Sequence, residues 1–400
     1  MPKLKRDLTM EQQLARGPMD LPFLMLVVLL TGIGVIMVLS ASYATAISEG
    51  HKDGAIHYFI RQAIFAGLGF VLMYIASKVN YQWYRWASVL VLALAFLLLV
   101  LVLIPGFHTV RTDNVKRWLR LPGFTFQPSE MAKLGVILYF SARMSKRNTE
   151  KRRQYDTRKP SGVILQALDD WGFMELVPYG AILLAIAVLM YFEPHLSGLI
   201  LIFVAAAAIL FAGGVKLRWF AMGGGLMAAV LALTLQGYQS DRILVWQDPW
   251  AHPKDGGYQI IQSLYAIGSG GLFGVGFGQG RQKQGFLPEA ENDFIFSIAC
   301  EELGLIGAGL ILLLFVLLIL RGYWIALHAR DRFGSLLVVG ITTLMAVQVF
   351  LNISVVTNFL PTTGVSLPFF SYGGTALMIQ LIEMGIVLGV SRQVPAPKQG

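Results

Sequence analysis

The sequence predicts an all-α polytopic membrane protein with about ten transmembrane helices. Three observations predict this class. Of the 400 residues, 56% are hydrophobic and only 14% are charged. The apolar residues form uninterrupted runs of about twenty residues, the length that an α-helix needs to cross the hydrocarbon core of a bilayer. The charged residues lie between these runs, so we expect one helical membrane domain rather than two or three soluble domains.

Ten apolar runs follow one another along the chain. We expect helices over residues 21–47, 57–77, 83–105, 129–145, 177–193, 195–213, 215–236, 297–320, 334–360 and 369–391. The first run is too long for the apolar region of a cleavable signal peptide, and no small-residue cleavage pattern follows it. We therefore expect a membrane domain over 21–392, with polar tails at 1–20 and 393–400.

The distribution of basic residues predicts the orientation. An even number of spans puts both termini on one side, and 21 of the 32 Lys and Arg residues fall on that side against 9 on the other. Because cytoplasmic loops carry the excess of Lys and Arg, we expect both termini in the cytoplasm. The same distribution explains the net charge of +9 without any nucleic acid partner. The basic cluster at 143–159 is expected to anchor the topology at anionic lipid, with docking of a cytoplasmic partner as the alternative.

Two extracellular loops are exceptions to this bias. Eight of the nine outer basic residues fall in the loops at 106–128 and 237–293, which suggests that these loops share a task. The second loop lies between spans seven and eight and continues to residue 296. It is longer than a connection between two helices requires, so we expect it to carry chemistry.

The loop at 106–128 and the helix after it contain polar residues suited to a lipid-linked anion. Arg117 offers forked donors that suit a phosphate, and Trp118 prefers the level of lipid headgroups. The alternative is an interfacial amphipathic segment whose side chains reach towards the headgroups. Glu130 and Lys133 share one face of the fourth span. Ionisable residues inside a span are functional candidates, although an internal Glu130–Lys133 pair is an equally simple explanation.

The glycine-rich run from 268 to 280 invites comparison with a nucleotide-binding loop. It lacks the Lys-Ser/Thr ending of a phosphate-binding loop and the strand–helix frame of a dinucleotide fold. Tight turns that let the backbone follow the membrane surface explain these glycines better.

Four segments in order resemble the FtsW/RodA group of the SEDS family (shape, elongation, division and sporulation), and more FtsW than RodA. They are RWLRLPGFTFQPSEMAK, DPWAHPKDGGYQIIQSLYAIGSGGLFGVGFGQGRQK, LPEAENDFIF…EELGLIG and NFLPTTGVSLPFFSYGGTALM, within a likeness over about residues 20–392. The resemblance implies a peptidoglycan glycosyltransferase that polymerises lipid II at the outer face of the bacterial cytoplasmic membrane. It implies as partners the undecaprenyl-linked glycan, a class B penicillin-binding protein that supplies the transpeptidase, and other divisome or elongasome membrane proteins.

The resemblance also implies roles for individual residues. The catalytic aspartate of the family's DFIF motif is Asp293 here, which would take a proton from an acceptor sugar hydroxyl. Basic residues would stabilise the departing pyrophosphate, although the four in the second loop could equally be solvated loop charges. The substrate-binding candidates are Arg117, Trp118, Glu130, Lys133, Arg242, Lys254, Arg281, Lys283, Glu289 and Ser371.

The carboxylates beside Asp293 bear on this chemistry. Repulsion from Glu289 and Glu291 would raise the pKa of Asp293 and make it a better base. A divalent cation, Mg²⁺ or Mn²⁺, could bridge Asp293, Glu289 and Glu291, although their spacing is not diagnostic of a metal site. An ordinary acid at the start of a helix is the simpler alternative for Asp293 taken alone.

Three segments depart from the family pattern. His195 stands in FEPHLSG where an aspartate is expected, so a required acid there is in doubt. Glu291 and Asn292 stand where a histidine and a threonine are usual, which changes the electrostatics beside the catalytic position. Gln239 replaces a common arginine, so only Arg242 of that pair remains.

Two other functions stay open: a flippase that moves lipid II, and a non-enzymatic division scaffold that recruits the transpeptidase. A flippase is expected to carry charges deep within several helices, and the deep candidates here are few: Arg61, Lys133 and Glu383. The charge lies instead in the outer loops, which favours chemistry at the surface. A scaffold would leave the combination of an acid with basic residues in those loops unexplained.

Overall fold

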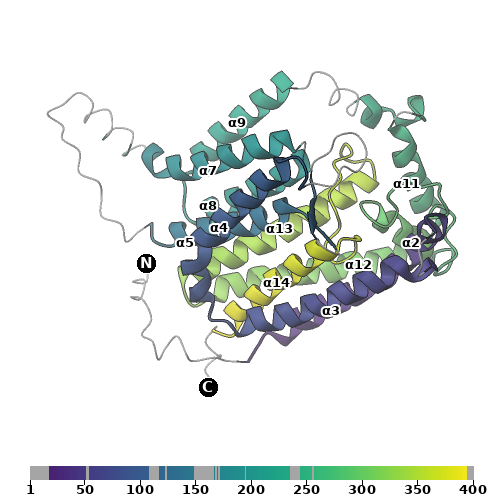
Figure 1. Cartoon of the computed structure of the whole chain (residues 1–400), viewed down its shortest axis with the longest axis horizontal. Helices are drawn as coiled ribbons and strands as arrows, with labels where there is room; N and C mark the ends of the chain where they lie inside the picture. Colours follow the sequence, from purple (N-terminus) through teal and green to yellow (C-terminus); the bar gives the residue numbers. More distant parts are fainter. Residues whose placement is uncertain are drawn as a thin grey trace.

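A computed structural model gives the fold of the chain (Figure 1). It describes residues 18–50, 54–107, 117–121, 124–147, 166, 169, 172–193, 195–234, 244–254 and 256–393. Most of both predicted tails, and most of the basic cluster at 143–159, lie outside these residues.

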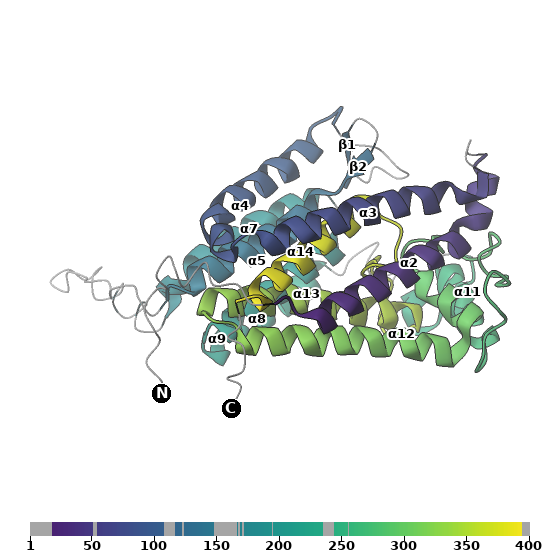
Figure 2. The ribbon, with the colours of Figure 1, turned by 90° about the horizontal axis from the view of Figure 1, so that it is seen from below.

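Ten long helices pack side by side in the described part of the chain (Figures 1 and 2). Each corresponds to one predicted span, and the predicted fold class is confirmed. Seven of them are long and apolar enough to cross a membrane by length and composition. The helices are α2 (Leu21–Ser48), α3 (His57–Lys78), α4 (Tyr81–Leu103), α5 (Pro128–Met144), α7 (Phe173–Phe192), α8 (Leu196–Ala212), α9 (Leu217–Thr234), α12 (Ile295–His328), α13 (Arg332–Val356) and α14 (Gly374–Ser391).

The bundle has central and peripheral helices. In its most apolar window α14 is 78% buried and α13 is 61% buried, whereas α7 is only 17% buried. A helix that is apolar on all sides and yet exposed is explained by lipid around it. Figure 1 shows α13 in the middle of the bundle, with α7 on one side and α12 on the other.

Both ends of the described chain lie at the same end of the bundle. The backbone amide of Asp20, just before α2, lies 3.3 Å from the hydroxyl of Ser391 at the end of α14. Asp20 also caps α2 by accepting from the amide of Phe23, and it forms an ion pair with Arg321 of α12 at 2.8 Å. This arrangement agrees with an even number of spans. We call this end the inner end and the opposite end the outer end, after the predicted orientation.

The outer connections contain regular structure that the sequence analysis missed. Strands β1 (Leu119–Leu121) and β2 (Phe124–Phe126) form an antiparallel hairpin, in which Arg120 pairs with Thr125. Figure 2 shows this hairpin beyond the end of α4. The large loop before α12 contains α11 (Gly257–Ser269) and a short 3-10 helix, η2 (Pro249–Ala251); another, η1 (Gly54–Ile56), precedes α3. The outer loops are therefore folded structures that can position side chains.

Candidate functional site

A cavity of about 830 Å³ lies at the outer end of the bundle. Its walls come from α3, the β-hairpin, α5, the start of α8, residues 289–293, residues 364–373 and the start of α14. Seven of the predicted site residues, which are far apart in the sequence, line it together: Arg117, Trp118, Glu130, Lys133, Glu289, Asp293 and Ser371.

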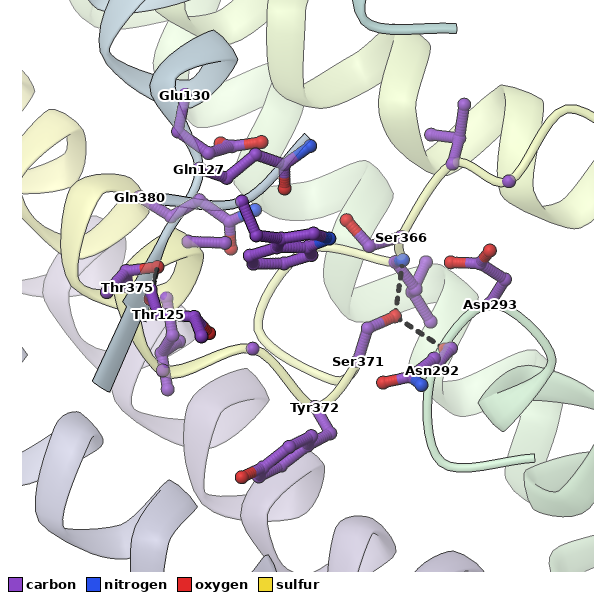
Figure 3. Close-up of a pocket in the computed structure, with 18 of the residues that line it drawn as sticks. Thr125, Gln127, Glu130, Asn292, Asp293, Ser366, Ser371, Tyr372, Thr375 and Gln380 are labelled. Atoms are coloured by element: carbon purple, nitrogen blue, oxygen red, sulfur yellow. Dashed lines mark hydrogen bonds between the residues drawn. The ribbon is translucent and has the colours of Figure 1, made fainter. Parts of the chain in front are cut away.

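Hydrogen bonds to the backbone fix the wall that carries Asp293. The amide of Asn352, on α13, donates to the carbonyl of Asp293 and to the carbonyl of Val365, each at 2.8 Å. The hydroxyl of Ser371 donates to the carbonyl of Asn292 at 2.8 Å (Figure 3). The segment before α12 and the segment before α14 are therefore joined into one wall by buried or half-buried side chains.

Helices α3 and α14 hold the same wall from behind. The side-chain amide of Gln62 donates to the carbonyl of Ser371 at 3.2 Å and accepts from the amide of Gly373 at 3.3 Å. The carbonyl oxygen of Gln380 accepts from the amide of Phe369 at 3.1 Å. Phe369 has φ 65, a left-handed conformation that is unfavourable for a bulky residue and that persists only when its surroundings impose it. The loop before α14 is thus rigidly held.

The electrostatic surroundings of Asp293 suit a base. Burial, and after it repulsion from Glu289, raise its pKa to about 6 against the opposing effect of Arg117. A Cβ atom on Gly364 would lie 3.3 Å from Oδ2 of Asp293, so the backbone approaches the carboxylate closely here. Near neutral pH the carboxylate is mostly ionised, and yet it binds a proton more readily than an ordinary aspartate.

The opposite wall carries an ion pair. Lys133 Nζ lies 2.7 Å from Oε1 of Glu130, and their side chains are 3% and 8% exposed. Figure 3 shows Glu130 and Gln127 across the cavity from Asp293. Glu130 and Lys133 therefore form the internal ion pair that was one of the two explanations for them. Both residues also line the cavity.

The connection between α7 and α8 contains a buried acid that the sequence analysis missed and that contacts Arg117 without lining the cavity itself. Glu193 is 1% exposed, and burial raises its pKa to about 8, against the effect of Arg117. The Arg117 Nε donates to the carbonyl of Glu193 at 3.3 Å. The carboxylate oxygens of Glu193 have no hydrogen-bond partner among the described residues. In the sequence, the signal that could have indicated Glu193 is that it is a single acid in a short connection that contains no Lys or Arg.

His195 lines the cavity beside this connection. Burial, and the charges of Arg117 and Lys133, lower its pKa to about 3, so the ring is neutral. Its Nε2 lies 3.5 Å from the side-chain nitrogen of Gln127, and its Nδ1 has no partner in the described structure. A Cβ atom on Gly198 would lie 2.7 Å from Nδ1. The imidazole is therefore an uncharged hydrogen-bonding group, and the backbone of Gly198 lies so close to it that a methyl group there would overlap the ring.

Three other predicted residues, Lys254, Arg281 and Lys283, are not among the residues that line the cavity. Lys283 Nζ forms a buried ion pair with Glu302 at 2.5 Å and lies 2.7 Å from the hydroxyl of Ser40. Lys254 and Arg281 are exposed elsewhere in the loop, and Arg242 lies outside the described residues.

The three carboxylates considered for a metal do not converge. Glu291 is buried and accepts from the hydroxyl of Thr45 at 3.4 Å, whereas Glu289 and Asp293 line the cavity. Within the described ranges no group of three or more His, Cys, Asp or Glu side chains is placed to hold a metal ion.

The fold and the site define a multi-pass membrane protein with a polar cavity at one end of its helical bundle. The family described as "Cell cycle protein" (FtsW, RodA and SpoVE) matches residues 21–395, and the chain belongs to this family. The family predicted from the sequence is therefore confirmed.

Relatives and solved structures cover nearly the whole chain. "Probable peptidoglycan glycosyltransferase FtsW" of Geobacter sulfurreducens (strain ATCC 51573 / DSM 12127 / PCA) is 40% identical over 94% of this chain and 95% of its own. "Stage V sporulation protein E" of Bacillus subtilis (strain 168) is 40% identical over 93% and 97%. A chain of a peptidoglycan synthase complex, described as coordinating polymerization and crosslinking, has a TM-score of 0.70 at 26% identity over 94% and 98%. RodA of Thermus thermophilus has a TM-score of 0.66 at 24% identity over 95% and 98%, and supports the fold.

Proposed function

We propose that this protein is a peptidoglycan glycosyltransferase that polymerises lipid II at the outer face of the bacterial cytoplasmic membrane, with both termini in the cytoplasm. The observation that carries the proposal is the placement of Asp293. This carboxylate, whose pKa is raised to about 6, faces a cavity of about 830 Å³ that basic residues also line. The relatives named as probable peptidoglycan glycosyltransferases support the same activity.

Asp293 acts as the general base in this proposal. Its carboxylate accepts the proton of the acceptor sugar hydroxyl, and the hydroxyl oxygen attacks the anomeric carbon of the donor. The bond between that carbon and the undecaprenyl pyrophosphate breaks, and the pyrophosphate leaves with the bonding electrons. The positive charges of Arg117 and Lys133 stabilise the developing negative charge. Glu130 holds Lys133 in place at 2.7 Å.

Neighbouring groups position the substrates. Trp118 offers a flat apolar surface within the cavity, and His195 offers an uncharged nitrogen. Ser371 serves chiefly through its hydrogen bond to Asn292, which holds the segment of the base. Glu289 and Asp293 alone do not fit a resident Mg²⁺ or Mn²⁺ site, because such an ion would need further oxygen ligands from the substrate phosphates.

We further propose that the chain works beside a class B penicillin-binding protein as its transpeptidase partner, together with other division or elongation proteins of the membrane. The similar chain in a peptidoglycan synthase complex supports this partnership. Polymerisation and crosslinking would then occur at the same membrane face.

A gel assay tests the activity. The protein, purified with its cognate penicillin-binding protein, is given fluorescent lipid II and a divalent cation, and we expect a ladder of glycan chains. Asp293→Asn should abolish the ladder. Asp248→Asn is the matched control, because Asp248 is an exposed carboxylate of the same loop that caps η2 by accepting from the Ala251 amide at 3.1 Å.

Three outcomes would contradict the proposal. If Asp293→Asn polymerises at the parent rate, the assignment of the base is wrong. If no sample forms a ladder while lipid II crosses reconstituted vesicles, the protein is a flippase. If neither activity is found but the partner is bound, the protein is a scaffold.

A further inference from the structure

Helix α12 is broken near its outer end. Gly304 has φ 68 and ψ −174, so the helical hydrogen-bond pattern stops there. A continuous helix would join the carbonyls of Glu301 and Glu302 to the amides of Leu305 and Ile306. The break separates these four backbone groups, and each needs another partner if it is not hydrated.

The segment 271–276 of the preceding loop supplies all four partners. It donates two hydrogen bonds to the carbonyls above the break and accepts two from the amides below it. The amides of Val275 and Gly276 donate to the carbonyls of Glu301 at 3.0 Å and Glu302 at 3.1 Å, respectively. The amides of Leu305 and Ile306 donate to the carbonyls of Gly271 at 2.9 Å and Leu272 at 3.2 Å, respectively. The two backbones approach so closely that a Cβ atom on Gly274 or Gly304 would overlap the other segment. The level of the loop along α12 is therefore fixed.

The large side chains of residues 271–277, which comprise this segment and Phe277, are apolar and exposed. Leu272 is 59% exposed, Phe273 is 81% exposed and Phe277 is 49% exposed. On the adjoining turn of α12, Leu305 and Ile306 are 66% and 50% exposed. The apolar surface of the loop thus continues the apolar surface of the helix without a charged residue between them.

The length of α12 places this surface within the bilayer. Arg321 pairs with Asp20 at the inner end of the bundle. At 1.5 Å per residue, Leu305 lies roughly 24 Å further along the helix. The hydrocarbon core of a bilayer is about 30 Å thick, so this level falls just inside its outer edge. Backbone inside lipid must have its hydrogen bonds satisfied, which the pairing across the break provides.

We infer that residues 271–277 form an anchor embedded in the outer leaflet, where Leu272 and Phe273 contact lipid acyl chains. This anchor is distinct from the catalytic proposal and does not depend on it. It fixes the depth of the outer part of α12, which begins two residues after Asp293. The catalytic segment is thereby held at a constant height relative to the headgroups.

Spin labelling tests the anchor. Phe273→Cys is labelled with a nitroxide in the purified protein, which is reconstituted alone into phosphatidylcholine vesicles. Cys300, the single cysteine, is buried and stays in place, and the parent protein measures its residual labelling. Collisions with oxygen, which concentrates in lipid, are compared with collisions with a water-soluble nickel chelate. Leu310→Cys, 57% exposed on α12, is the lipid reference, and Lys254→Cys in the large loop is the aqueous reference.

We expect the oxygen-to-nickel ratio at residue 273 to lie close to that at residue 310 and well above that at residue 254. A ratio equal to that of residue 254 would place the loop in water and overturn the inference. A label shielded from both reagents would show that protein, rather than lipid, covers the surface, and would overturn it equally. Because the assay needs no substrate, failure of the catalytic proposal would leave its result unchanged.

Discussion

Removing the ammonium group of Lys283 distinguishes a structural ion pair from a contact with substrate. Lys283 Nζ lies 2.5 Å from Glu302, and the two side chains are 5% and 0% exposed. The substitution Lys283→Met keeps most of the side-chain volume, but leaves the buried carboxylate with Ser40 as its neutral donor. Removing one partner of a buried pair costs about 3–5 kcal/mol, because the remaining charge stays buried without compensation. We therefore expect a marked fall in the midpoint of thermal unfolding in detergent.

Two further variants sharpen this test. The double variant Lys283→Met, Glu302→Leu removes both charges and should recover most of the lost stability, because apolar replacement of a buried pair is often neutral. Arg281→Met removes an exposed charge nearby and should change stability by less than about 0.5 kcal/mol. If Lys283→Met unfolds at the parent temperature but cannot polymerise lipid II, Lys283 serves the substrate and the structural argument is refuted.

The remaining predictions concern the cavity. Because the raised pKa of Asp293 is near 6, its basic form is lost as the pH falls, and initial rates should drop about tenfold from pH 7 to pH 5. Glu289→Gln should move that midpoint to lower pH, and an unchanged midpoint would contradict the repulsion inferred between the two residues. Asn352→Ala removes two hydrogen bonds to the site backbone and should lower stability by about 1–3 kcal/mol together with the rate; a thermal melt beside the gel assay checks both. Gly198→Ala places a methyl group against the cavity-lining imidazole and should raise KM for lipid II, whereas Gly180→Ala, with open space around it, should not.

The number of spans and the location of the site could be predicted from the sequence. Bilayer thickness sets the length of an apolar run, so ten runs gave ten helices without knowledge of their packing. Counting spans then places Arg117, Glu130 and Asp293 at the same end of the bundle, although they are far apart in the sequence. Their meeting in one cavity follows from topology together with the need to keep polar groups out of lipid.

Individual partners could not be predicted, because packing between distant segments decides them. Lys283 looked like a cation of an exposed loop, yet its carboxylate partner is on α12 and its hydroxyl partner, Ser40, is on α2. Asn352 lies within an apolar span, where a polar side chain commonly binds a neighbouring helix, but its amide binds the backbone of the site. The β-hairpin did have a local signal: in the sequence, apolar and polar residues alternate on both sides of a Pro-Gly dipeptide.

The way in which residue 293 is held makes its substitution informative. Asn352 binds its carbonyl group, and in the described structure no hydrogen bond to its carboxylate is recorded. The wall on which it lies is further joined by Ser371 and Gln62, whose bonds also go to main-chain atoms. Replacing the carboxylate with an amide therefore leaves the contacts that build the wall intact, while it removes the carboxylate that accepts the proton in the proposed reaction. A loss of polymerisation in Asp293→Asn without a loss of stability follows from this separation, and unfolding of that variant would show that the carboxylate also holds the structure.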